Sequence, residues 1–195
     1  QARAKGYTGK GVTIALIDGP IDTKAPELKG ANITDKSRCT VEEAPSGLNH
    51  GTALASILVS QNYGVAPDAM LYLYQASDDN SLSGGTCVVG DKRLDSYALL
   101  INQAIDDGAQ IISISMSAPD ASDDVKWAIA RAMNEGVIIV NSAGNTGADN
   151  NANQLSRWSG VVGVSAIKSD GSFADYSSWG NGVTTAAFGE PFTGR

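Results

Sequence analysis

Short apolar runs alternate along this chain with segments of helical spacing, and that alternation constrains the fold more than any other feature. Residues 12–17 read Val-Thr-Ile-Ala-Leu-Ile, a nearly continuous apolar run that is typical of a strand buried on both faces of a parallel sheet. Asp18-Gly19-Pro20 closes this run as a turn. Further runs of strand length occur at 70–74, 110–116, 137–142, 161–167 and 183–188.

Helical spacing predicts two amphipathic helices between these runs, each ended by a glycine. The first has its apolar positions at Tyr97, Leu100, Ile101, Ala104 and Ile105, and it stops at Gly108. The second has them at Val125, Ala128, Ile129, Ala132 and Met133, with Ser122 as N-cap and Gly136 as the stop. The alternation therefore predicts an α/β fold with a mostly parallel central sheet and helices on both faces.

Three other segments complete the expected order of elements. Residues 23–49 are polar and predict irregular structure, and residues 78–90 predict a polar loop. Residues 51–60 predict a short helix rich in small side chains, with His50 capping its start.

Composition limits the classes of function that remain. With 195 residues, 42% hydrophobic and 18% charged, the chain is long enough for one globular domain with a large core. The net charge of −7 argues against a nucleic-acid surface, which needs clustered lysine and arginine. Apolar runs stay far below the ~20 residues of a membrane-spanning helix. The N-terminus shows no signal-peptide pattern, and Gln1 is compatible with a processed end.

The two cysteines, Cys39 and Cys87, stand alone in loop-like sequence and match neither a zinc cluster nor a redox motif. A disulfide between them would stabilise the fold by about 4 kcal/mol in the chain-entropy model, provided that the compartment is oxidising. Two free thiols are the alternative, and the residues alone leave both open.

Three polar residues are candidates for acid-base chemistry. His50 is the only histidine, and an imidazole with an ordinary pKa near ~6.5 exchanges protons readily at neutral pH. Asp18 and Asn145 follow two predicted strands, at the sheet edge where α/β sites collect. An amide at Asn145 can donate to a developing oxyanion. Each residue also has a structural interpretation: a hydrogen-bonded histidine, an Asx-turn aspartate and a left-handed turn asparagine.

Four segments in order resemble the subtilisin-like serine protease family, the S8 subtilases, over nearly the whole chain. They are the residues around Asp18, then His50-Gly51-Thr52, then residues 64–67, and then residues 142–145. The family places its triad in the order Asp, His, Ser. The resemblance implies a three-layer subtilisin-like fold and serine endopeptidase activity on peptide or protein substrates.

The resemblance also implies a role for each matched residue. Asp18 orients the imidazole, His50 is the general base, and Asn145 is the side-chain donor of the oxyanion hole. Ser115, Met116 and Ser117 pair with an extended substrate, while Ser142, Ala143 and Gly144 line the pocket for the residue before the cut. No cofactor, nucleic acid or membrane span is expected.

Several positions depart from the usual pattern of the family. Gly19-Pro20 replaces Thr-Gly, a variant similar to subtilases that mature cyanobactin-type peptides, and Ala53 replaces a second histidine. Ser117 replaces a glycine that is usual in the substrate-pairing strand of the family, so we expect the adjacent pocket to be narrower. The short link from Ser60 to Gly64 lacks the insertion that forms a calcium site in secreted relatives, so no metal is expected there.

The nucleophile is the largest departure. In the family the catalytic serine lies in a Gly-Thr-Ser-Met-Ala-like motif, and no Gly-Thr-Ser occurs in this chain. We expect residues 1–195 to be the N-terminal portion of a single peptidase domain, incomplete without a C-terminal segment. The serine then lies on a following segment or on a second chain, a complementary C-terminal fragment, as in a nicked two-chain enzyme. A catalytically inactive, subtilase-like peptide-binding module is the alternative. The expected location is secreted or extracytoplasmic, with the cytoplasm as the alternative.

Overall fold

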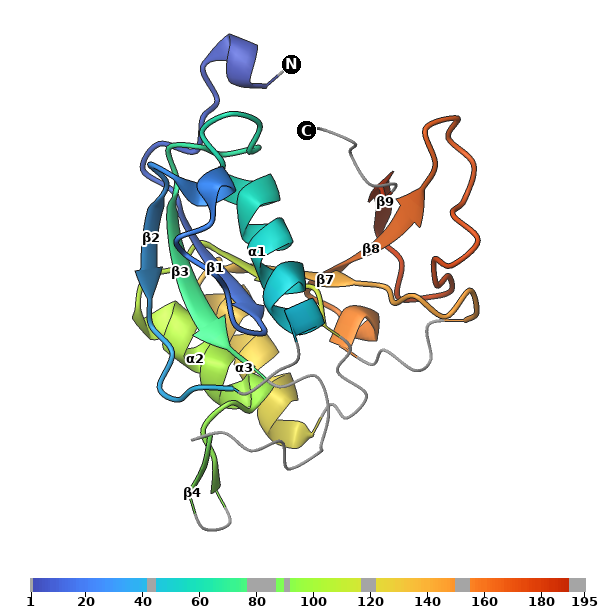
Figure 1. Ribbon diagram of the computed structural model, residues 1–195. Helices are drawn as coiled ribbons and strands as arrows, with labels where there is room; N and C mark the ends of the chain where they lie inside the picture. Colours follow the sequence, from blue (N-terminus) through green and yellow to red (C-terminus); the bar gives the residue numbers. More distant parts are fainter. Residues whose placement is uncertain are drawn as a thin grey trace. The chain divides into compact units, whose positions relative to one another are not determined.

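A computed structural model describes residues 2–41, 45–76, 87–89, 92–116, 122–149 and 155–189. The chain forms two compact units, Gln1–Ser113 and Ile114–Arg195 (Figure 1). The first holds η1 (Arg3–Lys5), β1 (Thr13–Asp18), η2 (Pro26–Leu28), β2 (Asn32–Asp35), α1 (Pro45–Val59), β3 (Met70–Gln75), β4 (Val88–Val89), β5 (Lys92–Arg93), α2 (Tyr97–Asp106) and most of β6 (Ile111–Ile114). The second holds α3 (Asp123–Asn134), β7 (Ile138–Ser142), η4 (Leu155–Arg157), β8 (Val161–Ile167) and β9 (Thr185–Phe188).

In the first unit, β3 lies between β2 and β1, and both pairings are parallel. The register sets Thr13 of β1 opposite Met70 and Asp18 opposite Gln75. Gln110, just before β6, is tied to β1 by a bond from its backbone N–H to the Thr13 carbonyl. Asp18 is thus the last residue of a central strand, at the carboxyl edge of the sheet.

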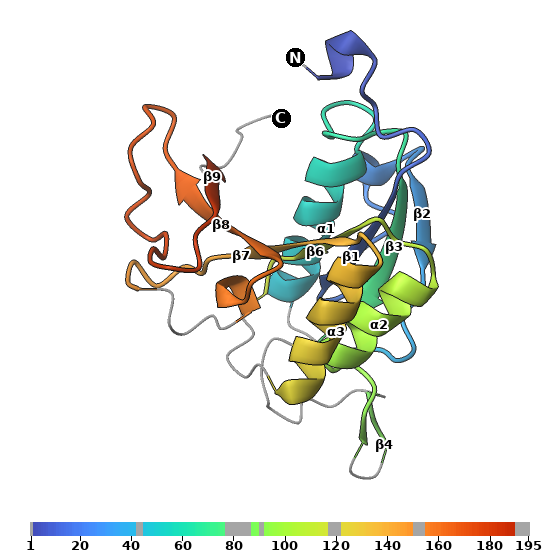
Figure 2. The same ribbon diagram turned by 180° about the vertical axis from the view of Figure 1, so that it is seen from behind.

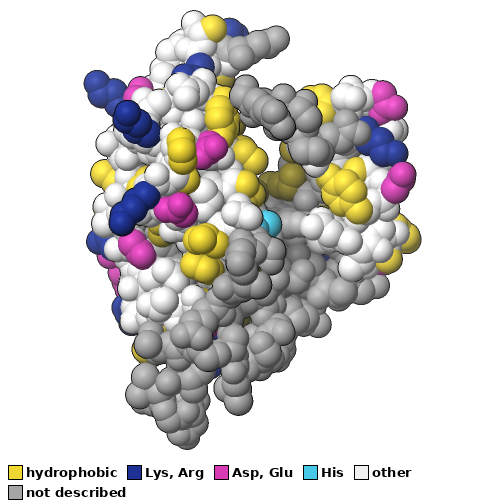
Figure 3. All heavy atoms as spheres, in the orientation of Figure 1, with side chains coloured by type: hydrophobic (Ala, Val, Ile, Leu, Met, Phe, Trp, Pro, Cys, Tyr) yellow, Lys and Arg dark blue, Asp and Glu magenta, His cyan; other side chains and the backbone are white. Residues whose placement is uncertain are grey.

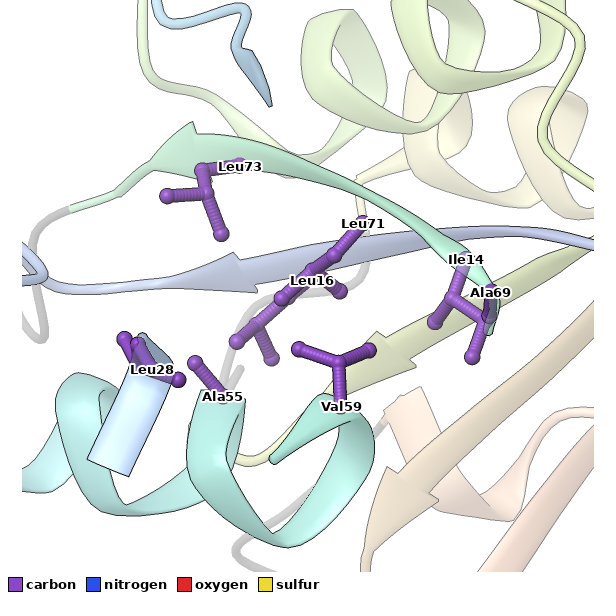
Figure 4. Packing of buried hydrophobic residues seen from close by; sticks show 8 residues of the cluster. All are labelled: Ile14, Leu16, Leu28, Ala55, Val59, Ala69, Leu71 and Leu73. Carbon is purple, nitrogen blue, oxygen red and sulfur yellow. The ribbon is translucent and has the colours of Figure 1, made fainter. Parts of the chain in front are cut away.

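Helices cover both faces of this sheet. Alternate residues of a strand point to opposite faces, and Ile14 and Leu16 of β1 face α1. These two side chains pack with Ala55 and Val59 of α1, as Figure 4 shows. Helix α2 lies on the other face, in front of the strands when the molecule is seen from behind (Figure 2). Four apolar residues of α2 are buried there: Leu100, Ile101, Ala104 and Ile105.

The second unit repeats the parallel arrangement. β8 lies between β7 and β9, with Ile139 of β7 opposite Val161 and Ile167 of β8 opposite Phe188. α3 packs on β7 through buried Val125, Ala128, Ile129 and Ala132, whereas Met133 is largely exposed. The predicted α/β class with a mostly parallel sheet is therefore confirmed. No helix in the described part of the chain is long and apolar enough to cross a bilayer.

The structure corrects the sequence prediction in three segments of the first unit. Residues 23–49 contain η2, β2 and the start of α1 instead of irregular structure alone. The described end of the 78–90 loop leads into a small antiparallel hairpin of β4 and β5. His50 does not cap a helix that begins at residue 51, because α1 begins at Pro45. Proline is favoured in the first turn, where its fixed φ fits and no N–H is needed.

Candidate active site

Asp18 is almost completely buried, with 1% of its side chain exposed, yet its carboxylate contacts the imidazole ring of His50. Its Oδ1 lies 2.9 Å from Nδ1 of His50 and accepts a 2.9 Å hydrogen bond from the backbone N–H of Gly19. Its Oδ2 is buried and has no hydrogen-bond partner among the described residues. Burial of a carboxylate is costly unless it is hydrogen-bonded, so these contacts stabilise its position at the end of β1.

His50 lies in the second turn of α1 and is about half exposed, in contrast to Asp18. Figure 3 shows the histidine, in cyan, at the molecular surface. A carboxylate only accepts hydrogen bonds, so a neutral His50 ring carries its proton on Nδ1 when it bonds to Asp18. Nε2 is then the basic nitrogen of the ring. A buried carboxylate that orients an accessible imidazole is the arrangement needed for general-base chemistry.

Gly51 allows α1 to approach the end of β1. A Cβ atom at this position would lie 2.9 Å from the carbonyl oxygen of Pro20, 2.9 Å from Cγ1 of Ile21 and 3.2 Å from Oδ1 of Asp18. Any larger residue would push the helix away from β1. The glycine after the histidine therefore keeps the two functional groups within hydrogen-bond distance.

Thr52 ties the same helix to the segment that follows Asp18. Its hydroxyl accepts a 3.0 Å bond from the backbone N–H of Asp22 and donates a 2.6 Å bond to the carbonyl of Leu48. Sequence reasoning gave Thr52 no structural role of its own. For Gly51, the small side chains of residues 51–60 and the position directly after His50 were the available signals.

Asn145 lies in the second unit, three residues after β7, and it is exposed. Its loop has glycines with positive φ on either side, Gly144 at 107° and Gly147 at 63°. No other residue type in the described chain has a positive φ, so the interpretation of Asn145 as a left-handed turn residue is wrong. The two glycines make the turn, which leaves the asparagine free of that requirement.

The expected substrate-binding segments also lie in the second unit. Ala143 is fully buried, and its N–H donates to the carbonyl of Val164 at 2.8 Å. The N–H of Gly144 donates to the hydroxyl of Ser142 at 3.1 Å. Ser115 and the buried Met116 follow the end of β6, while Ser117 lies outside the described residues.

Asn141 is a further polar residue of this unit to which sequence reasoning gave no role. It is buried within β7, and its Nδ2 donates to the carbonyls of Ile114 at 2.8 Å and Met116 at 3.3 Å. The amide thereby fixes the path of the chain as it leaves β6. A polar asparagine directly after the apolar run 137–140 of this strand was the signal that could have found it.

A disulfide joins Cys39 to Cys87, with their Cα atoms 4.9 Å apart, and this decides between the two states that the sequence left open. Val41 and Leu94 pack against the two cysteines. The bridge connects the segment before α1 with the start of the β4–β5 hairpin. In the described residues, no group of three or more His, Cys, Asp or Glu side chains is placed to hold a metal ion.

Comparison with known proteins shows which family this chain is similar to. The sequence profile of the subtilase family, Peptidase_S8, matches residues 9–192. The chain is 32% identical over 197 residues to the thermostable alkaline protease of Halalkalibacterium halodurans, covering 97% of this chain and 50% of that protein. It is 28% identical over 200 residues to subtilisin E of Bacillus subtilis, covering 95% and 49%. The chain thus spans about half the length of these relatives.

Solved structures show the same fold. The prenylagaramide maturation protease PagA superimposes with a TM-score of 0.74 at 24% identity, covering 92% of this chain and 62% of that one. The self-cleaved protease domain of PatA has a TM-score of 0.70 at 27% identity, covering 90% and 65%. With a profile match across nearly all of its length, this chain belongs to the subtilase family.

Proposed function

We propose that this chain supplies the aspartate, the histidine and an oxyanion donor of a serine endopeptidase. The 2.9 Å contact between Oδ1 of buried Asp18 and Nδ1 of His50 carries the proposal. It lies at the carboxyl end of a parallel strand, where α/β enzymes place their catalytic groups. Asn145, from a separate loop, is the proposed amide donor to the oxyanion.

The proposed reaction is acyl transfer in two halves. Nε2 of His50 takes the proton of a serine hydroxyl as its oxygen attacks the peptide carbonyl, and Asp18 stabilises the imidazolium. The Asn145 amide donates to the carbonyl oxygen as it gains negative charge. The imidazolium then gives its proton to the leaving amine as the peptide C–N bond breaks, and the acyl group remains on the serine oxygen as an acyl-enzyme. Water attacks this ester with His50 as base, releasing the second product and restoring the serine.

The serine itself is proposed to lie on a segment outside residues 1–195. Two observations support this: the chain contains no Gly-Thr-Ser, and its matched relatives are about twice as long. Both units would then belong to one peptidase domain, since the family profile runs across them. A complementary C-terminal segment is accordingly the proposed partner.

The proposed substrate is an extended peptide or protein segment. It would pair through its backbone with residues 115–117, and residues 142–144 would line the pocket before the cut. A secreted or extracytoplasmic location is favoured by the Cys39–Cys87 disulfide, since such bonds persist in oxidising compartments.

Replacing His50→Ala in the enzyme assembled with its serine-bearing segment tests the base. We expect hydrolysis of a peptide substrate to fall by about 10⁴-fold or more, because the proton of the serine then has no acceptor. The neighbouring exposed residue provides a control, and Asn49→Ala should retain activity. Unchanged turnover in His50→Ala would remove His50 from the mechanism.

A fluorophosphonate probe tests the nucleophile and separates a protease from an inactive module. Mass spectrometry of the assembled enzyme should find the label on a serine outside residues 1–195, and His50→Ala should abolish the labelling. An assembly that binds peptide but never takes up the probe would instead support the peptide-binding module.

A further inference from the structure

Ser178 lies beneath the loop that carries Asn145 and contacts the residues on both sides of the asparagine. It is 1% exposed, whereas Asn145 and Thr146 are exposed. The backbone N–H of Ser178 donates to the carbonyl of Gly144 at 2.9 Å. Its hydroxyl oxygen accepts a 3.2 Å bond from the N–H of Thr146 and shares a 2.9 Å hydrogen bond with the Thr146 hydroxyl.

These bonds fix the backbone immediately before and after Asn145. Gly144 and Gly147 have positive φ. Because glycine has no Cβ, its backbone can adopt many other conformations unless other contacts restrain it. The N–H of Gly147 is also held, by the carbonyl of Tyr176 at 2.8 Å. The loop from 144 to 147 is therefore restrained at three of its four residues by the segment 176–178. Only Asn145 makes no contact of this kind.

Ser178 is itself anchored to the sheet. The neighbouring hydroxyl of Ser177 accepts a 2.8 Å bond from the N–H of Ala166 in β8 and donates a 3.2 Å bond to the carbonyl of Ser178. A rigid strand thus supports Ser178, and Ser178 supports the loop. Oxyanion donors are effective when they are held in place before the charge develops, and a shift of about 1 Å can cost about 10²-fold in rate.

We propose that Ser178 is a positioning residue that preorganises the Asn145 amide for oxyanion stabilisation through its hydroxyl contacts with Thr146. The inference rests on the proposed function, because it assigns a support to the proposed oxyanion donor. Ser178 does not touch the reacting atoms, so its effect on catalysis must pass through Asn145.

The test uses steady-state kinetics of the assembled enzyme with a peptide substrate. We expect Asn145→Ala to lower kcat by about 10²- to 10³-fold. Ser178→Ala should lower kcat and kcat/KM together, by about ten- to a hundredfold, while KM changes little. Ser178→Cys, of nearly the same size, should be intermediate because a thiol is a weaker donor and acceptor.

Thr146→Val provides a variant at an exposed site, so the test survives if Ser178→Ala fails to fold. It removes only the hydroxyl bond and should lower kcat by a smaller factor than Ser178→Ala, whereas Thr146→Ser should restore it. Ser165→Ala is the matched control, a buried serine in β8 that should leave kcat unchanged.

A double variant separates positioning from general stability. In the Asn145→Ala background, Ser178→Ala should cause no further loss of kcat, because the group it positions is gone. Additive losses would overturn the inference, as would wild-type kcat in both Ser178→Ala and Thr146→Val. If Asn145→Ala itself retains full activity, the proposed oxyanion role fails instead.

Discussion

Gly51 is the residue at which α1 comes closest to the end of β1. The space for a side chain is taken by the Pro20 carbonyl, Ile21 and the Asp18 carboxylate. The contact between Asp18 and His50 therefore depends on a position that carries no functional group. The packing of Gly51 against the end of β1 therefore also determines the contact between Asp18 and His50.

We predict that Gly51→Ala lowers peptide hydrolysis by about 10²-fold, since the helix must move away from Asp18. Overpacking should also cost about 1–3 kcal/mol in the free energy of unfolding. Steady-state kinetics and denaturant unfolding measure the two effects. Ile57→Ala, on an exposed position of the same helix, should change activity little. Wild-type activity in Gly51→Ala would show that the close approach is unimportant.

Tyr74 is a second residue with a notable environment, and it lies on the α2 side of the first unit. Its hydroxyl donates a 2.9 Å bond to Oδ2 of Asp107, and Nζ of Lys36 lies 3.5 Å from Oδ1 of the same carboxylate. Burial, followed by the hydrogen bond to Asp107, raises the pKa of Tyr74 above its ordinary value. The fold therefore favours the neutral phenol.

This pKa shift predicts a loss of stability in alkali. The contribution of Tyr74 is fully present below the unfolded-state pKa near ~10 and is lost as the pH rises above it. We expect Tyr74→Phe to reduce the free energy of unfolding by about 1–2 kcal/mol at pH 8 and to flatten its decline between pH 9.5 and 11. Urea unfolding across this range provides the measurement. Tyr7→Phe, an exposed tyrosine, should keep the wild-type slope, and an equal slope in Tyr74→Phe would contradict the assignment.

Among the elements, the β4–β5 hairpin stands out because a covalent bond connects it to the segment before α1. The Cys39–Cys87 bridge has a sequence separation of 48 residues, and the closed loop includes the whole of α1 and β3. Arg93 of the hairpin also forms a two-point pair with Asp95, at 2.9 and 2.7 Å. The helix that carries His50 therefore belongs to the stretch of chain between the two bridged cysteines.

Replacing both cysteines by serine should lower the free energy of unfolding by about 4 kcal/mol in the chain-entropy model. Thermal unfolding of the oxidised and variant proteins measures the difference, with a reductant added to the wild type as a second route to the same state. Titration of two free thiols in the native oxidised protein would contradict the bridge.

On the scale of the whole molecule, the second unit has an apolar row at its β8–β9 edge. Ile167 is paired with Phe188 on one side and with Phe173 through an isolated bridge on the other. Phe173 and Phe188 are 52% and 59% exposed, and all residues of β9 are exposed. Neighbouring residues across a sheet point to the same face, so these side chains form one surface. Such an edge favours association.

We therefore predict that residues 1–195, produced without a further segment, bind a hydrophobic dye and self-associate. Phe188→Lys should reduce both, because a charge opposes edge pairing. Sedimentation and dye fluorescence provide the measurements. Trp127→Lys, at an exposed position of α3, is the control and should have the smaller effect. Monomeric, dye-negative wild-type protein would remove the edge as an association site.

Much of the fold could be predicted from local pattern. Apolar runs located six strands of the sheet, and helical spacing located α2 and α3, because strand and helix periods depend on neighbouring residues alone. β2 and the first turn of α1 were missed because their sequences lack an apolar period, and β2 is stabilised by its pairing with β3. Asp18 and Asn145 were proposed because each follows a predicted strand, and His50 because it is the only histidine and precedes Gly51-Thr52.

The sequence by itself determined the alternation of strands and helices, the sheet edge at which Asp18 lies, and the motifs of the subtilase family. Only the tertiary structure decided that Asp18 bonds to His50, that Cys39 pairs with Cys87, and that Ser178 lies under the Asn145 loop. The physical reason is distance along the chain. Contacts between residues 32 to 48 positions apart depend on how the whole chain packs, and no local pattern records that packing.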